Sequence, residues 1–141
     1  MKLLMDGYGY VPIFYSSRKL LTNYFVYLNK KKEQELYYLT KEGKSYPIYE
    51  DNFGTYILSP HILSVITELP SLINRQLDYL VLNGLYIDDS SFAKIIDYFS
   101  QAFNNLDLTK ALNKRIALIS PRPLSLNFLH QQTIYRVKKH D

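Results

Sequence analysis

The sequence has no cysteine and no tryptophan among its 141 residues, and only five glycines. Without cysteine the chain can form no disulfide, and it can supply no thiolate to zinc or to an iron–sulfur cluster and no cysteine nucleophile. No apolar run approaches the roughly 18 residues of a membrane span, and MKLLMDGYGY at the start lacks the long apolar core and cleavage site of a secretory signal. We therefore expect a soluble, cytoplasmic protein with no membrane partner.

The length and composition are those of a single globular unit. With 47% hydrophobic and 21% charged residues, the chain can bury a real core, but it is too short for two ordinary domains. We expect residues 1–141 to form one domain or one fragment of a larger domain. The net charge of +4 favours an anionic partner without requiring one.

Tyrosine is abundant, with fourteen copies. Tyrosine suits pleated surfaces that are exposed on one side, where its ring packs and its hydroxyl reaches water. The tyrosines fall inside strand-like runs and do not alternate with clustered basic residues. The sequence therefore favours sheet packing over a platform for stacking nucleic-acid bases.

The first half of the chain reads as strands and turns. LLMD at 3–6 predicts a strand, and Gly7, Gly9 and Pro12 then predict a long loop. A meander of about four strands follows. Its expected strands are NYFVYLN at 23–29, LYYLT at 36–40, YPIY at 46–49 and TYIL at 55–58.

The second half changes to a helical period. Ser59 as N-cap and Pro60 at the first helical position predict a helix that Pro70 interrupts and that restarts over 71–76. DYLVLNG at 78–84 is nearly all apolar, as is typical of a strand buried on both faces of a parallel sheet.

The remaining elements alternate helix and loop. A helix over 91–106, capped by the oxygens of 88–90, carries an apolar stripe. The stripe consists of Phe92, Ile95, Ile96, Phe99 and Phe103. A short helix at 108–114, a proline-broken loop at 120–128 and a strand at 133–139 complete the chain. The fold class is therefore α/β, or α+β as a fragment, with a β-meander followed by helix–strand–helix. Its single parallel-type strand lacks the neighbours that such a strand needs.

Four stretches resemble successive motifs of the collagenase-like peptidase family U32. They are GYVPIFYSSRKLLTNYF, YPIYEDNFGTYILSPHIL, LINRQLDYLVLNGLY and NFLHQQTIYRVKK. The resemblance implies the C-terminal part of a longer protein whose missing part would supply most of a TIM-like barrel. It divides the chain into a barrel strand and loop at 1–22, an inserted meander at 23–58, and a barrel-type helix–strand–helix with the tail at 59–141.

The function that the resemblance implies is itself divided. Some members are described as collagen-degrading peptidases, and others act in hydroxylation of tRNA, rRNA or quinones. Many bind an iron–sulfur cluster through cysteines that follow a segment like SRKLLTNY, where this chain has none. We expect an accessory or catalytic component of tRNA uridine hydroxylation more than a true protease, with no cofactor bound by this chain itself.

The alternative is a non-catalytic binding or assembly module that pairs with a cysteine-bearing, cluster-binding paralogue. As a fragment, the chain would also self-associate through apolar surface around Leu80, Leu82, Ile95 and Phe99. Contact with RNA through the basic segments NKKK and RVKKH is a further expectation, and DNA is not an expected partner.

Candidate site residues come from the same motifs. Where the family usually has a lysine-isoleucine-glutamate-glycine-arginine strand end, this chain has Val-Leu-Asn-Gly-Leu at 81–85, which indicates a degenerate site or another ligand at Asn83. Ser17 and Arg18 either offer donors to a phosphate or carboxylate or simply cap a helix or turn. The three histidines have no metal-site spacing, and no serine sits in a glycine-flanked elbow, so we assign no metal and expect no peptidase activity from this chain alone.

The acidic segment EDNFG at 50–54 allows two interpretations. Glu50 and Asp51 are adjacent, which in a strand points them to opposite faces and suits a shared catalytic proton poorly. We favour a turn in which Asp51 or Asn52 bonds the local backbone and Gly54 takes a positive φ. The alternative is that Glu50 forms a salt bridge with a basic residue such as Arg18 and shapes a pocket.

Overall fold

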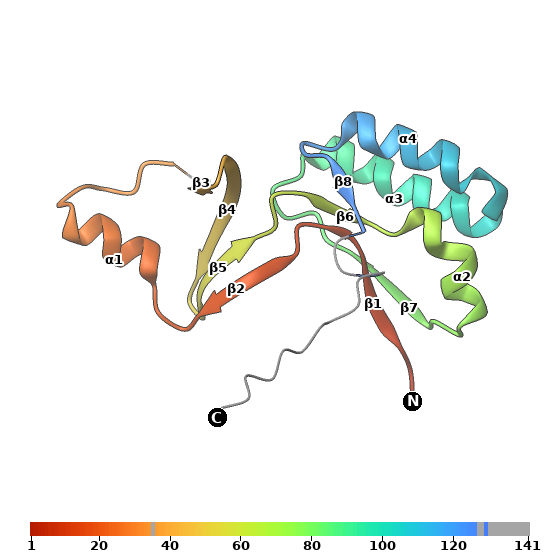
Figure 1. Cartoon of the computed structure of the whole chain (residues 1–141), viewed down its shortest axis with the longest axis horizontal. Helices are drawn as coiled ribbons and strands as arrows, with labels where there is room; N and C mark the ends of the chain where they lie inside the picture. Colours follow the sequence, from red (N-terminus) through yellow and green to blue (C-terminus); the bar gives the residue numbers. More distant parts are fainter. Residues whose placement is uncertain (35, 127–128, 130–141) are drawn as a thin grey trace, which may run out of the picture.

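Two four-stranded sheets organise the chain in the computed structural model, which describes residues 1–34, 36–126 and 129. The strand order is β7-β1-β6-β8 in one sheet and β2-β5-β4-β3 in the other. Helices α2 (Leu69–Asn74), α3 (Asp89–Asn104) and α4 (Thr109–Ile119) gather beside the first sheet, here called the covered sheet. The second, here called the meander sheet, extends away from them toward α1 (Leu20–Tyr27; Figure 1). The fold is therefore mixed α/β, as the sequence predicted.

The covered sheet mixes parallel and antiparallel pairs. β1 (Leu4–Gly9) runs parallel to β7 (Tyr79–Leu82) and antiparallel to β6 (Ile62–Ser64). β6 in turn runs parallel to the two-residue strand β8 (Leu124–Ser125). The parallel β1–β7 pair agrees with the expected pair of barrel strands, but β6 is antiparallel, so the TIM-like barrel stays a prediction.

The apolar core lies between the covered sheet and its helices. These are η1 (Ile66–Glu68), α2 (Leu69–Asn74), α3 (Asp89–Asn104), η2 (Leu106–Leu108) and α4 (Thr109–Ile119). Buried side chains from β1, β5, β6 and these helices form one cluster. Its members are Tyr8, Tyr10, Leu58, Ile62, Ile66, Leu69, Ile87, Ile95, Phe99, Ala102, Leu112 and Ile116.

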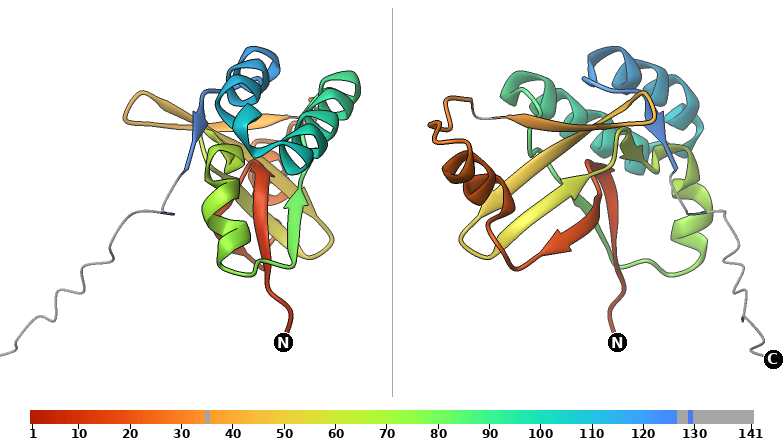
Figure 2. Two further views of the ribbon diagram at one scale, coloured as in Figure 1. Left: turned by 90° about the vertical axis from the view of Figure 1, so that its right-hand side faces the viewer. Right: turned by 60° about the vertical axis from the view of Figure 1, so that its left-hand side comes forward.

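The meander sheet consists of β2 (Pro12–Ser16), β3 (Tyr37–Lys41), β4 (Lys44–Asp51) and β5 (Gly54–Leu58). One face, with Tyr49, Tyr56 and Leu58, packs against the core of the covered sheet. On the other face the strand registers align Tyr37 with Ile48 and Ile48 with Ile57. Helix α1 (Leu20–Tyr27) packs beside this second face, and Figure 2 shows it at the end of the sheet remote from α2.

Several predicted elements are confirmed. The strand at 3–6, the meander strands at 36–40, 46–49 and 55–58, the helices at 91–106 and 108–114 and the strand within 78–84 all form, with shifted ends. Residues 37–58 contain no helix. The Asp88 carboxylate caps α3 by accepting from the Ser91 N–H at 3.0 Å.

The strand predicted at 23–29 is wrong, because these residues belong to α1. Leu21 and Phe25, four residues apart, line one side of an apolar groove, and this helical spacing competes with the alternation in NYFVYLN. The long loop predicted after Gly9 is also wrong, since β2 begins at Pro12. Proline fits there because it is the first residue of an edge strand.

The helix predicted from Ser59 and Pro60 is wrong. The Ser59 hydroxyl accepts from the Val11 N–H at 3.1 Å and donates to the His61 carbonyl at 2.7 Å, so it caps no helix. The following residues form β6, which completes the sheet between β1 and β8. Only the restart after Pro70 is confirmed, as α2 with this proline in its first turn.

Burial corrects two further expectations. β7 is not buried on both faces, since Tyr79 is exposed and the other three residues are half-buried. Ile95 and Phe99 lie in the core, so they cannot form a surface between copies, whereas Ile96 and Phe103 of the same stripe are about half exposed. β8 forms within the predicted loop, and the strand predicted at 133–139 lies outside the described residues.

Over the described part of the chain, no helix combines the length and apolar character needed to cross a membrane.

Candidate functional site

The N-terminus of α1 is held by a carboxylate from a different strand. Glu50, near the end of β4, accepts hydrogen bonds from the backbone N–H of Leu21 at 2.8 Å and of Thr22 at 3.2 Å. The hydroxyls of Thr22 and Thr55 also donate to this carboxylate. The first N–H groups of a helix lack intrahelical partners and carry a partial positive charge, so the Glu50 carboxylate satisfies them and stabilises α1.

These contacts change the acidity of Glu50. Partial burial opposes its ionisation, but the hydrogen bonds from Thr22, Thr55 and Leu21 outweigh that effect and hold the pKa of this carboxyl below its usual value. Glu50 is therefore a fixed anion at neutral pH. All its contacts serve the junction of α1 with β4 and β5, which is a structural role.

Ser17 and Arg18 lie beside this junction, and both side chains are exposed. The Thr55 hydroxyl lies 2.8 Å from the Arg18 carbonyl oxygen and shares its one hydrogen between this oxygen and the Glu50 carboxylate. The Arg18 N–H donates to the Ser16 hydroxyl at 3.2 Å. Glu50 and Arg18, both of which the structure describes, do not form the salt bridge of the alternative interpretation. The Arg18 guanidinium instead faces solvent beside the turn that leads into α1.

Asn83 lies in another part of the molecule, at the end of β7. Its N–H donates to the Tyr8 carbonyl at 2.9 Å, and its side-chain oxygen accepts from the Leu85 N–H at 2.9 Å. Asn83 therefore shapes the turn that leaves the covered sheet. The structure brings Ser17, Arg18 and Glu50 to one end of the meander sheet, and Asn83 is not part of that group.

The segment EDNFG forms the turn between β4 and β5, as the favoured interpretation predicted. The Asp51 carboxylate accepts from the Phe53 N–H at 2.8 Å, and Gly54 has a φ of 141°. A β-carbon on Gly54 would lie only 2.0 Å from the Ser16 carbonyl oxygen. Glycine is needed at this position both for the backbone angle and for the close approach of β2.

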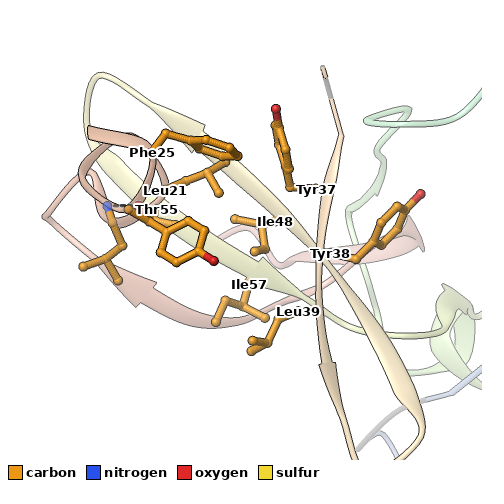
Figure 3. Close-up of a pocket in the computed structure, with 10 residues that line it drawn as sticks. Leu21, Phe25, Tyr37, Tyr38, Leu39, Ile48, Thr55 and Ile57 are labelled. Atoms are coloured by element: carbon orange, nitrogen blue, oxygen red, sulfur yellow. Dashed lines mark hydrogen bonds between the residues drawn. The ribbon is translucent and has the colours of Figure 1, made fainter. Parts of the chain in front are cut away.

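An apolar groove of about 410 Å³ lies between α1 and the meander sheet. Figure 3 shows Phe25 and Leu21 on the helix facing Tyr37 and Ile48 across this groove. The rings of Phe25 and Tyr37 pack with their centroids 5.0 Å apart. The full lining is Leu20, Leu21, Tyr24, Phe25, Tyr37, Tyr38, Leu39, Ile48, Thr55 and Ile57.

A second, more polar cavity of about 510 Å³ adjoins this groove and shares Phe25 and Tyr37 with it. Lys30 and Lys31 line this second cavity. The basic segment NKKK predicted a contact with RNA, but its position beside an aromatic groove was not predicted. The helical spacing of apolar residues just before the lysines was the available signal.

Basic residues are frequent in the segment of the chain that contains α1 and β3. Residues 17–45 contain seven basic and three acidic residues, a net charge of +4. The rest of the chain has ten of each sign, so this segment accounts for the whole net charge. Of these basic residues, Lys30 and Lys31 line the second cavity, whereas Lys41 and Lys44 flank the β3–β4 turn at the other end of β4.

The described residues contain no group of side chains suited to bind a metal ion. Within residues 1–34, 36–126 and 129, no three histidine, aspartate or glutamate side chains are grouped so that they could hold a metal ion. An iron–sulfur cluster bound by thiolates does not fit the residues present, because the chain has no cysteine. Two of the three histidines, His130 and His140, lie outside the described residues.

Comparison with known proteins identifies relatives over nearly the whole chain. The model of Peptidase family U32 matches residues 1–139. The chain is 30% identical over 153 residues to tRNA hydroxylation protein P2 of Bacillus subtilis (strain 168), which covers 96% of this chain and 50% of that protein. The chain thus spans about half the length of this curated relative. No solved structure matches the chain.

Proposed function

The chain belongs to peptidase family U32, and we propose that it acts in the hydroxylation of tRNA at uridine rather than as a protease. The observation that carries this proposal is the 30% identity to tRNA hydroxylation protein P2, which extends over 96% of the chain. The chain covers only half of that relative, so its proposed role is that of one component of tRNA hydroxylation, either accessory or catalytic.

The charge distribution supports an RNA-directed role. An RNA substrate presents a dense array of phosphates, and residues 17–45, which include Lys30 and Lys31 beside the groove, carry a net charge of +4. Ser17 and Arg18, exposed at the same end of the meander sheet, are additional donors for phosphate oxygens.

We propose that the barrel-like part of the protein is completed beside β7. β1 and β7 are parallel neighbours, and β7 is the edge of its sheet among the described residues. An unpaired parallel edge with half-buried Leu80 and Leu82 is the place where further strands of a TIM-like barrel would add. In that arrangement Asn83 lies at the C-terminal end of a barrel strand, where such enzymes bind substrates.

The same edge supports the second candidate, a non-catalytic module that assembles with a cysteine-bearing paralogue or with another copy of this chain. Such a partner would supply the cluster ligands that this sequence lacks. In this case β7 would be covered by the partner. Sedimentation of the purified chain at micromolar concentration, alone and mixed with the paralogue, measures both forms of association.

The principal experiment measures hydroxylated uridine in tRNA from the natural host by nucleoside mass spectrometry. Deleting the gene for this chain should lower the hydroxyuridine content, and restoring the gene should recover it. A strain that also lacks other members of the family controls for redundancy. If this chain restores no hydroxyuridine in that strain and its loss changes none in the parent, the proposed function is wrong.

A further inference from the structure

We propose that the groove between α1 and the meander sheet receives unpaired bases of RNA, while the lysines beside it hold the adjoining phosphates. The groove is made by Tyr24, Phe25 and Tyr37 together with aliphatic residues of β3, β4 and β5. The inference rests on the proposed function, because that function makes RNA the partner. It adds the surface, the strandedness of the RNA and the residues that bind it.

The aromatic rings of the groove suit flat, uncharged bases. Tyr24 is 56% exposed, and its ring lies at 78° to that of Phe25 with their centroids 5.7 Å apart. Both faces of a base can stack on aromatic side chains, and such stacking tolerates any base sequence. Bases inside a duplex are already stacked and cannot enter, so the groove selects single-stranded RNA.

Helix α1 presents apolar surface that the rest of the described chain does not cover. It has no buried residue, and Tyr24, Val26 and Tyr27 are each more than half exposed. Exposed apolar surface of this kind marks binding sites more often than structural ones. The question is which partner covers it.

Charge indicates that the partner is RNA. Lys30 and Lys31 line the cavity next to the groove together with Glu33, and residues 17–45, which include α1 and β3, carry a net charge of +4. A second copy of this chain would bring the same positive surface into contact with itself. A nucleic acid brings phosphates to the lysines at the same time as it brings bases to the aromatic rings.

The lysine segment and the groove are fixed to each other. The Tyr37 hydroxyl accepts hydrogen bonds from the backbone N–H groups of Glu33 and Gln34, both at 2.9 Å. These bonds fasten the loop that follows the lysines to one wall of the groove. Glu50 fixes the other wall by holding the N-terminus of α1. Bases and phosphates would therefore meet a site that is formed before binding.

The experiment measures binding of the full 141-residue chain to a fluorescently labelled 12-nucleotide oligouridine by anisotropy, free and annealed to its complement. The wild-type chain should bind the single strand more tightly than the duplex. Tyr24→Leu keeps the apolar character but removes the ring, and should weaken binding by about fivefold to a hundredfold. Tyr24→Phe keeps the ring and should retain binding, which separates loss of stacking from damage to α1.

Tyr79→Leu is the matched control, because Tyr79 is likewise half exposed but lies on β7 in the covered sheet. It should leave the affinity unchanged within twofold. Combining Lys30→Gln with Lys31→Gln should reduce the slope of log Kd against log salt by about 1.4, since each phosphate contact on a single strand contributes about 0.7.

Three results would overturn the inference: equal binding of duplex and single strand, equal effects of Tyr24→Leu and Tyr79→Leu, or no RNA binding by the wild-type chain. Conversion of a wild-type dimer to a monomer by Tyr24→Leu, with RNA affinity unchanged, would assign the groove to a second copy instead. Hydroxyuridine that depends on the gene while the groove binds no RNA would refute this inference alone. The proposed function fails independently if hydroxyuridine does not depend on the gene.

Discussion

The covered sheet and the meander sheet each contain four strands, but their environments differ sharply. Helices α3 and α4 each bury three side chains beside the covered sheet, whereas α1 buries none beside the meander sheet. Burial of an apolar side chain such as Phe99 contributes about 1.5–3 kcal/mol, so the covered half has a strong apolar core. The α1 end of the meander half depends more on strand pairing, aromatic contacts and the hydrogen bonds of Glu50.

This difference explains why the proposed RNA-binding groove lies at the α1 end of the meander sheet. The covered half buries many apolar side chains in one core, so it can serve as a rigid support, although Ile96 and Phe103 of α3 stay about half exposed. The α1 end keeps apolar rings and positive charge accessible, at the expense of a smaller contribution to stability. Binding surfaces are often drawn from the less stable parts of a fold in this way.

The largest expected effect comes from removing a core ring. Phe99 is 2% exposed and packs edge-on to Tyr8, so Phe99→Ala should lower the free energy of unfolding by about 3–5 kcal/mol. Phe25→Ala, at the α1 groove, should cost only about 1 kcal/mol because Phe25 is half-buried. Urea unfolding measures both, and equal losses would show that the two halves do not differ as described.

The next effect tests the turn that joins β4 to β5. Gly54→Ala should cost roughly 1–3 kcal/mol from backbone strain alone, with a further loss from the contact to the Ser16 carbonyl. Gly43→Ala is the matched control, because Gly43 also has a positive φ, of 74°, but has open space around it. Urea unfolding should show the greater loss for Gly54→Ala. Similar losses would mean that the close approach of β2 is unimportant.

Glu50→Gln should have a smaller effect, about 1 kcal/mol at neutral pH, because it removes a charged cap from α1. The pKa of Glu50 is lower in the folded state than its usual 4.5, so the folded state binds fewer protons and the stabilisation is complete above that pH. This stabilisation is lost as the pH falls below about 4.5 and then through the lower pKa that Glu50 has in the folded state.

The stability difference between wild type and Glu50→Gln should therefore shrink as the pH is lowered through this range. Urea unfolding at a series of pH values measures it. Glu42→Gln removes the same charge at the exposed turn after β3 and serves as the control. A difference that is independent of pH would contradict the role of the carboxylate as an anionic cap.

The smallest effects compare one hydroxyl in each half. The Tyr8 hydroxyl shares a hydrogen bond of 2.8 Å with the hydroxyl of Ser120, which follows the last residue of α4, so Tyr8→Phe should cost about 1 kcal/mol. The Tyr15 hydroxyl donates to the exposed Phe53 carbonyl at 2.7 Å, and Tyr15→Phe should change stability by less than about 0.5 kcal/mol. Thermal unfolding should rank them in this order. The reverse order would place the more important polar contact at the meander sheet.

The elements that the sequence predicted correctly depend on local interactions. The start of α3 follows from Asp88, whose carboxylate reaches an N–H three residues away. The turn at 50–54 follows from Asp51 and Gly54, because the carboxylate bonds an N–H two residues away and glycine takes the positive φ. The meander strands follow from short tyrosine-rich runs between such turns.

The candidate site was only partly predictable for the same reason. The sequence pointed to Glu50 but not to its role, because the backbone N–H groups that donate to its carboxylate belong to residues up to 29 positions away. It pointed to Ser17 and Arg18 beside Glu50, and it placed Asn83 correctly at the end of a strand. The sequence could not show that Asn83 contacts β1, whereas Ser17, Arg18 and Glu50 lie beside α1.

By itself the sequence determined the α/β character, the family and the absence of thiolate chemistry within these residues. Tertiary structure alone decided that 20–27 is a helix and that 62–64 is a strand, since both depend on partners distant in the chain. It also decided that Phe25 and Tyr37 meet beside the lysines. Periodicity and turn residues act over a few positions, whereas a groove requires packing between segments that the chain itself keeps apart.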